Sequence, residues 1–360
     1  MVARPHAGAA PVADEVAFSL ADPEGRLRRV RLVHELWRPR VGPDFARAGR
    51  GRPWTLSIPR PPVDRIEYRL EVTDAEGGVE TVCDPGNPLR APGPFGEKSV
   101  LELPGYRPPA WLDADADAPA GRREILTIES RTLHASFDVG LWTPAGVRGG
   151  RPLPLLLAHD GPEYADYSAL LRFAAAAVAA GEVPPFRVAL VPPRERNRDY
   201  SASARYGRAL VSELLPAIER AAPTPGGPEA RVALGASLGA LALVHAHRLR
   251  RGLFGGLFLQ SGSFFRQRFD RYERSFPHFD RISRFVGSVL GAAEWPDPVP
   301  AVLTCGTVEE NLANNRAVAS ALASQGYDVR LEVVRDAHNW IGWRDALAPH
   351  LPGLLRRLWE

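Results

Sequence analysis

A single serine, Ser237, lies in a G-x-S-x-G pentapeptide that could hold a nucleophile on a tight bend. The pentapeptide runs from Gly235 to Gly239, follows the apolar run RVAL and opens the helical pattern LGALALVHAHRL. A serine on such a strand-to-helix bend has a strained backbone, which small neighbours permit, and its hydroxyl projects above the sheet edge. We predict that Ser237 is a nucleophile and that the backbone N–H of Leu238 donates to a developing oxyanion. The alternative is a glycine-rich turn whose serine only caps the helix.

A serine hydroxyl is a weak nucleophile without a base, and the base needs an acid to orient its imidazole. His338 follows the last predicted strand, DVRLEVV, and Glu309 and Glu310 follow the strand PAVLTCG. The order serine, acid, histidine is that of doubly wound hydrolases. We therefore predict His338 as the base and one of the two glutamates as the acid. The alternative for the glutamates is a solvated helix start.

Short apolar runs separated by helical stretches surround these residues. The runs are LPLLLAHD, FRVALVPP, RVALGAS, GGLFLQSGS, PAVLTCG and DVRLEVVRD, preceded by REILTIES and ASFDVGLWTP, which are typical of an antiparallel pair. Continuous apolarity indicates strands that are buried on both faces, as in a parallel sheet covered by helices. Residues 117–360 are therefore predicted to form an α/β domain with a doubly wound, mostly parallel sheet.

The amino-terminal part has a different pattern, in which apolar and polar residues alternate between turn residues. The alternating runs are VAFSLADP, RRVRLVHELW, RPWTLSIPR, RIEYRLEVTD and KSVLELPG. They predict an all-β sandwich over residues 15–116, after a disordered leader at residues 1–14 and before a linker rich in Pro, Ala and Asp.

The composition is that of an ordinary globular protein, with 45% hydrophobic and 24% charged residues in a chain of 360. The net charge is +3, and nearly all of the positive charge is arginine, since Lys98 is the only lysine. No basic tail supports nucleic-acid binding. Cys83 and Cys305 lie in different predicted domains, which argues against a disulfide framework or a cysteine metal site. The start of the chain has no apolar stretch before Asp14, so we expect a cytoplasmic protein without a membrane segment.

Six motifs follow one another along the chain: LLLAHDGPEY, PPRERNRDYSAS, GASLGALALVHAH, LFLQSGSFF, CGTVEEN and RDAHNWIGWRDAL. Together they resemble the ordered motif set of the enterochelin (ferric enterobactin) esterase family, within the esterase D group of α/β-hydrolases. The amino-terminal segment DPGNPLRAPGPFGEKSVLELPG likewise resembles the early-set, immunoglobulin-like domain that precedes the hydrolase in that family. The resemblance covers most of the chain.

The resemblance implies roles for particular residues. Glu309 fits the family's G-x-x-E pattern and would be the acid, with Glu310 as the alternative. A backbone amide of Asp160 or Gly161 would supply the second oxyanion donor. Arg194, Arg196 and Trp340 would lie in the substrate site, where the arginines could attract an anion, although solvated loop arginines are an equal alternative.

The same resemblance implies a serine esterase that cleaves a small-molecule ester, such as a siderophore ester or lactone bond. It implies no metal and no organic cofactor, since the iron of a ferric siderophore would arrive as part of the substrate. We expect a monomer or a homodimer. One alternative is an acyltransferase on the same fold. Another is a carbohydrate-binding protein with a vestigial hydrolase domain, which would need tryptophans such as Trp37 and Trp54 at the surface rather than in the core.

The chain departs from the family pattern in two places. Asp336 and Ala337 precede His338, where the family often has two glycines, and they could tighten the loop or add a negative charge. The charged and aromatic segment at residues 264–298 could form a helical cap over the site, an amphipathic helix packed on the domain, or a dimer contact.

Overall fold

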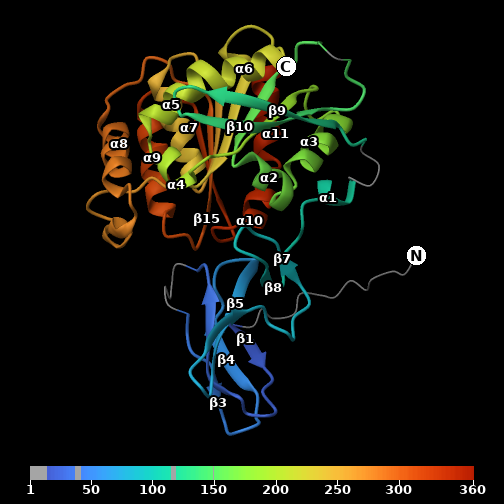
Figure 1. Cartoon of the computed structure of the whole chain (residues 1–360), viewed down its shortest axis with the longest axis vertical. Helices are drawn as coiled ribbons and strands as arrows, with labels where there is room; N and C mark the ends of the chain where they lie inside the picture. Colours follow the sequence, from blue (N-terminus) through green and yellow to red (C-terminus); the bar gives the residue numbers. More distant parts are fainter. Residues whose placement is uncertain (1–13, 37–41, 115–118, 149) are drawn as a thin grey trace. The chain divides into compact units, whose positions relative to one another are not determined.

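The structure is a computed structural model that describes residues 14–36, 42–114, 119–148 and 150–360. The chain divides into two compact units (Figure 1). The first contains the described residues up to Arg107 together with Arg335–Ala337, and the second contains those from Pro108 to Val334 together with His338–Glu360. The predicted boundary between residues 116 and 117 lies outside the described residues, as does nearly all of the predicted leader.

The described part of the first unit contains two antiparallel sheets. One has the order β1-β4-β3 and the other the order β2-β5-β8-β7, with β6 paired to β5. The strands are β1 (Glu15–Leu20), β2 (Leu27–His34), β3 (Ala46–Arg47), β4 (Trp54–Pro59), β5 (Arg65–Asp74), β6 (Val79–Val82), β7 (Arg90–Ala91) and β8 (Lys98–Glu102). The expected all-β domain is confirmed, and its immunoglobulin-like type stays a prediction.

The alternation of apolar and polar residues decides which side chains of these strands are buried. In β1, Val16, Phe18 and Leu20 are buried while the residues between them are exposed, as the period of two requires. Trp54, the first residue of β4, is also buried, and its indole N–H donates to Asp22 at 3.2 Å. Trp54 is therefore a core residue and does not present a ring for sugar stacking, whereas Trp37 lies outside the described residues.

The described part of the second unit is built on an eight-stranded sheet with the order β16-β15-β14-β13-β11-β12-β10-β9. The strands are β9 (Arg122–Ser130), β10 (Ala135–Thr143), β11 (Leu155–His159), β12 (Arg187–Val191), β13 (Arg231–Ala236), β14 (Gly256–Gln260), β15 (Ala301–Gly306) and β16 (Val329–Val334). β9 pairs antiparallel with β10, β10 pairs antiparallel with β12, and strands β11 to β16 are parallel to one another. The expected doubly wound, mostly parallel sheet is confirmed.

Helices cover both faces of this sheet (Figure 1). Leu155 and Leu157 of β11 pack on one face with residues of α5 to α9, and Leu156 and Ala158 pack on the other with residues of α2, α3, α10 and α11. The helical segments are α1 (Trp111–Ala114), α2 (Gly161–Tyr167), α3 (Leu170–Ala179), α4 (Arg196–Asp199), α5 (Ala204–Ala209), the π-helix η2 (Leu210–Leu214), α6 (Leu215–Ala221), η3 (Pro228–Ala230), α7 (Leu238–Leu249), η4 (Arg271–Ser275), α8 (Phe279–Gly291), α9 (Leu312–Ser324), α10 (Trp340–Asp345) and α11 (His350–Trp359).

The charged segment at residues 264–298 contains the amphipathic helix α8. Ile282, Val286 and Val289 of α8 are buried in the same apolar cluster as the residues of α7 and α9. The guanidinium of Arg281 donates to the backbone carbonyls of Ser201 and Arg198 at 2.5 Å. Of the expected alternatives, the structure therefore shows a helix packed on its own domain.

Candidate active site

The bend that carries Ser237 joins β13 to α7. Ser237 has φ 55° and ψ −123°, a conformation that is strained for a residue with a side chain. Its backbone N–H donates to the carbonyl of Gln260 at 2.8 Å, and its own carbonyl accepts from Ser263 at 3.1 Å. These two bonds, one to the last residue of β14 and one from the loop that follows it, hold the strained residue in place.

Close approach of neighbouring atoms requires the first glycine of the pentapeptide and crowds the second. A Cβ on Gly235 would lie 2.8 Å from the carbonyl carbon of Gly239, and a Cβ on Gly239 would lie 3.3 Å from the Cβ of His159. The first distance is shorter than atoms tolerate, so the bend could not form with a larger residue at position 235. The glycine at position 235 thus has a steric origin.

Ser263 contacts the predicted nucleophile directly. Its Oγ lies 2.9 Å from the Oγ of Ser237, and the residue is buried. The sequence analysis missed Ser263, although it lies in the motif LFLQSGSFF. Periodicity could not reveal it, because the contact joins two strand ends that are 26 residues apart.

His338 lies in the loop between β16 and α10, and its imidazole is paired with Glu309. Nδ1 of His338 lies 2.8 Å from Oε2 of Glu309, whose side chain is only 1% exposed. The other carboxylate oxygen accepts from the Gly306 N–H and from the Ser261 hydroxyl, both at 2.6 Å. With three hydrogen bonds at nearly full burial, Glu309 is fixed as a hydrogen-bond acceptor for the imidazole.

Trp343 of α10 contacts both His338 and Ser261, the serine that donates to Glu309. Its indole N–H donates to the Ser261 hydroxyl at 3.0 Å, and its ring meets the His338 ring edge-on with centroids 5.0 Å apart. One residue of α10 therefore contacts the imidazole itself and also the serine that holds the carboxylate. The sequence analysis did not identify Ser261 or Trp343.

Ser237, Glu309 and His338 follow the carboxyl ends of β13, β15 and β16, which are parallel strands of one sheet. The carboxyl ends of parallel strands lie at one edge, so the fold brings all three residues to the same edge. Glu310, the alternative acid, comes one residue later and is half-buried.

The loop after β11 lies beside the serine bend. His159 is fully buried, with Nδ1 3.2 Å from the Gly239 carbonyl and Nε2 3.0 Å from the Tyr206 hydroxyl. Asp160 has φ 50°, and its backbone N–H donates to the Tyr200 hydroxyl at 3.3 Å. Of the two expected oxyanion donors in this loop, the Asp160 amide is thus already hydrogen-bonded, which favours the amide of Gly161.

Arg196 does not present an unpaired charge. Its Nε and Nη2 donate to the two carboxylate oxygens of Asp160 at 2.9 and 2.8 Å. Burial alone would lower the pKa of Arg196, but the paired Asp160 carboxylate outweighs it and the pKa is raised. An anionic substrate would therefore meet an arginine that is already neutralised by Asp160.

The other two expected substrate residues lie in different surroundings. Arg194 is exposed in the loop before α4. Trp340, the first residue of α10, forms edge-on ring contacts with Tyr164 at 5.3 Å and Trp343 at 4.8 Å. Contact with a substrate stays a prediction for both.

Burial of His159 makes the stability of the protein depend on pH. Burial lowers the pKa of this imidazole to about 3, compared with 6.5 in an unfolded chain. The unfolded state therefore binds more protons between these values, so the free energy of unfolding falls as the pH falls through this window. We expect His159 to contribute a loss of about 2 kcal/mol between pH 7 and pH 5.

Chemical denaturation of the wild-type protein and of His159→Gln at both pH values measures this contribution. The variant should lose about 2 kcal/mol less than the wild type over the interval. His134→Asn changes an exposed histidine with positive φ and serves as the matched control, which should behave as the wild type does. If the wild type and His159→Gln lost the same free energy of unfolding between the two pH values, His159 would not be the source of the pH dependence.

A parallel sheet between two helical layers, with a strained serine bend after one central strand, is the architecture of α/β-hydrolases. The chain belongs to the putative esterase family, whose model matches residues 130–354. Within the described residues, no helix combines the length and apolarity that a bilayer crossing would need.

Known proteins that are similar in sequence or structure agree with membership of the putative esterase family. The chain is 27% identical over 282 residues to an iron(III) enterobactin esterase of Dickeya dadantii, a match that covers 74% of this chain and 63% of that protein. The match thus spans less than two thirds of the relative's length.

Two solved structures share the fold over nearly the whole chain. A ferric enterobactin esterase from Salmonella typhimurium superposes with a TM-score of 0.76 at 22% identity, covering 96% of this chain and 93% of the other. An enterobactin esterase from Shigella flexneri, solved in the presence of enterobactin, gives 0.74 at 20% identity, covering 96% and 92%. The family resemblance inferred from the sequence is confirmed.

Proposed function

We propose that this protein is a serine esterase that hydrolyses carboxylic esters through an acyl-enzyme on Ser237. The observation that carries the proposal is the hydrogen bond of 2.8 Å between Glu309 and Nδ1 of His338, at the sheet edge where the strained Ser237 also lies. An imidazole oriented by a buried carboxylate is the base that a serine hydroxyl needs. Family membership supports the same reaction class.

The reaction proceeds in two steps. In the first, Ser237 Oγ attacks the ester carbonyl while His338 Nε2 takes its proton, and Glu309 accepts a hydrogen bond from the Nδ1–H of the imidazolium. The backbone amides of Leu238 and Gly161 stabilise the oxyanion. His338 then returns the proton to the leaving alcohol. In the second step, His338 activates a water that attacks the acyl-enzyme and releases the acid.

The substrate class that we propose is a siderophore ester or lactone. Two relatives of this chain are iron(III) or ferric enterobactin esterases by name, and a third, an enterobactin esterase, was solved in the presence of enterobactin. Iron would enter as part of such a substrate and not as a cofactor of the protein. A cytoplasmic location and a monomeric or homodimeric state stay predictions of the sequence.

A panel of esters tests the substrate class. We expect kcat/KM for a catechol-siderophore trilactone to exceed that for p-nitrophenyl acetate and for a feruloyl ester by about 100-fold or more, because contacts remote from the reacting carbonyl contribute to the transition state. The reactions should be repeated with added glycerol, and the products should be identified by mass spectrometry. A preference for the simple esters would contradict the siderophore assignment, and dominant transfer to glycerol would identify an acyltransferase.

A further inference from the structure

Ser263 bonds to the proposed nucleophile at two points, and both residues belong to the second unit. Its backbone N–H donates to the carbonyl of Ser237 at 3.1 Å, and the two side-chain hydroxyl oxygens lie 2.9 Å apart. Ser263 is only 6% exposed, so water has little access to this contact. One residue therefore engages both the backbone and the side chain of Ser237.

The number of hydrogens decides which of the two hydroxyls is the donor. A serine hydroxyl has one hydrogen to donate and two lone pairs that accept. In the proposed reaction the hydrogen of Ser237 goes to Nε2 of His338, so the Ser237 oxygen can only accept from Ser263. Negative charge builds on this oxygen as its proton leaves, and a buried hydrogen-bond donor stabilises that charge.

Two buried asparagines fix the loop that carries Ser263. Oδ1 of Asn315 accepts from the Gly262 N–H at 2.9 Å, and its Nδ2 donates to the Gly262 carbonyl at 3.0 Å. Nδ2 of Asn311 donates to the Ser261 carbonyl at 2.7 Å. Asn315 and Asn311 are 0% and 6% exposed. The peptide units before Ser263 are thus held by buried hydrogen bonds, which define the position of its hydroxyl.

The same loop also holds the proposed acid. The Ser261 hydroxyl, two residues before Ser263, donates to Glu309 at 2.6 Å. Gly262 separates the two serines at a place where a Cβ would lie 2.2 Å from a carbon of the Phe264 ring. This close approach requires glycine. The S-G-S sequence therefore directs one hydroxyl to the acid and the other to the nucleophile.

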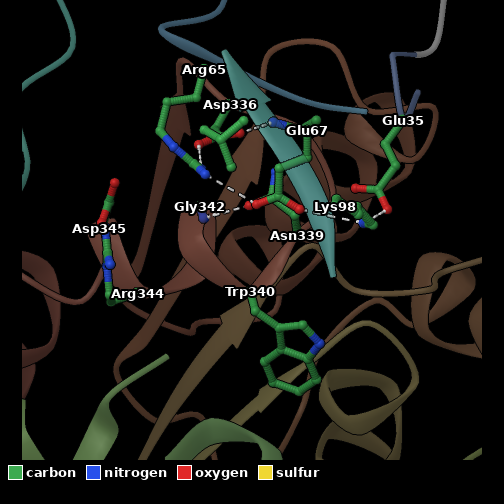
Figure 2. Close-up of polar contacts among 12 residues, drawn as sticks. Glu35, Arg65, Glu67, Lys98, Asp336, Asn339, Trp340, Gly342, Arg344 and Asp345 are labelled. Atoms are coloured by element: carbon green, nitrogen blue, oxygen red, sulfur yellow. Dashed lines mark hydrogen bonds and ion pairs between the residues drawn. The ribbon is translucent and has the colours of Figure 1, made fainter. Parts of the chain in front are cut away.

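The proposed base is fixed by other residues. Nδ1 of His338 lies 2.8 Å from Glu309. The next residue, Asn339, accepts from the N–H of Gly342 at 2.7 Å through its Oδ1 and caps α10 (Figure 2). These bonds do not involve Ser263. A change at position 263 should therefore disturb the nucleophile and leave the imidazole with its carboxylate partner.

We infer that Ser263 is a further catalytic residue, whose hydroxyl donates a hydrogen bond to Oγ of Ser237 and holds that oxygen in one rotamer for attack. The inference rests on the proposed function of Ser237. A serine side chain has three staggered positions, and only one of them directs Oγ to a given point. Without the Ser263 hydroxyl, the nucleophile would lose both this restraint and a donor to its developing charge.

The test begins with Ser263→Ala, which keeps the backbone bond to Ser237 and removes only the hydroxyl. We expect kcat/KM for p-nitrophenyl acetate to fall about 10-fold, which corresponds to about 1.4 kcal/mol of transition-state stabilisation. The rate of Ser237 phosphonylation by a fluorophosphonate should fall by a similar factor. The acid limb of the pH profile of kcat/KM should keep its apparent pKa, because the partners of His338 are unchanged. Wild-type or increased kcat/KM in Ser263→Ala would overturn the inference.

Ser263→Thr and Ser263→Val separate the hydroxyl from packing and serve as well if Ser263→Ala does not fold. Threonine and valine have nearly the same shape, so the added methyl group costs both variants alike, and only threonine can donate to Ser237. We expect kcat/KM of Ser263→Thr to exceed that of Ser263→Val by about 10-fold. Equal activity of the two variants would show that the hydroxyl has no role and would overturn the inference.

Ser130→Ala is the matched control. Ser130, the last residue of β9, is also a buried serine, and its hydroxyl donates to Glu213 and accepts from the Leu133 N–H. Its loss should lower the melting temperature without changing kcat/KM. If Ser130→Ala lost as much activity as Ser263→Ala, the loss would reflect general instability and the inference would fail.

Ser237→Ala separates this inference from the proposed function. If Ser237→Ala turned over like the wild type, the proposed function would fail. If Ser237→Ala were inactive while the Ser263 variants kept the wild-type kcat/KM, the proposed function would stand and only the role of Ser263 would be lost.

Discussion

Ser237→Ala should lower kcat/KM for p-nitrophenyl acetate by about 10⁴-fold or more and leave the fold unchanged. Without the hydroxyl no acyl-enzyme can form, and only the oxyanion donors and substrate binding remain to accelerate the reaction. The strain at this residue, with φ 55°, persists because its backbone is hydrogen-bonded to Gln260 at the end of β14 and to Ser263 in the loop that follows. Alanine keeps both backbone bonds, so the melting temperature should change little.

Ser212→Ala is the matched control for this substitution. Ser212 is an exposed serine of the π-helix η2, and its hydroxyl donates only to the carbonyl of Arg208 among the described contacts. Both variants remove one hydroxyl, but Ser212→Ala should keep the wild-type kcat/KM. Turnover by Ser237→Ala at the wild-type rate would exclude Ser237 as the nucleophile.

Glu309→Gln should lower kcat by about 10³- to 10⁴-fold. A glutamine amide cannot accept the Nδ1–H hydrogen bond with the strength of a carboxylate, and it can hold the imidazole in the wrong tautomer. The side chain also accepts from Gly306 and Ser261, so the variant should lose about 1–3 kcal/mol of unfolding free energy as well. Steady-state kinetics and thermal denaturation measure the two effects separately.

Glu310→Gln provides the comparison, because the two glutamates are neighbours and the sequence left both open as the acid. This variant should keep kcat within about threefold of the wild type, since the hydrogen bond to His338 comes from Glu309. A larger loss of activity in Glu310→Gln than in Glu309→Gln would reverse the assignment.

The sequence predicted the strands of both units because burial imposes a period that can be read directly. Alternation located β1, β2, β4, β5 and β8, and continuous apolar runs located β11 to β16. The expected antiparallel pair located β9 and β10. The sequence did not predict β3, β6 and β7, because strands of two to four residues are too short to show a period of apolar residues. The serine bend was also predictable from the G-x-S-x-G spacing between a strand and a helix, and close approach requires the glycine at position 235.

The rest of the site depends on contacts between residues that are distant in the sequence. Ser263 meets Ser237, and Trp343 meets Ser261 across 82 residues. No local pattern specifies which side chains meet at the end of a sheet. For the same reason, the sequence could not distinguish Glu309 from Glu310 by periodicity, although only Glu309 is shown to bond His338 among the described contacts.

The central claim is that Ser237, activated by His338 and Glu309, carries the acyl group during turnover. Rapid acid quenching of the wild-type enzyme with an activated ester, followed by peptide mass spectrometry, tests this claim most directly. We predict an added acyl mass on the peptide that contains Ser237, and no such mass in His338→Gln under the same conditions. An acyl group on a different residue, or equally rapid acylation in His338→Gln, would contradict it.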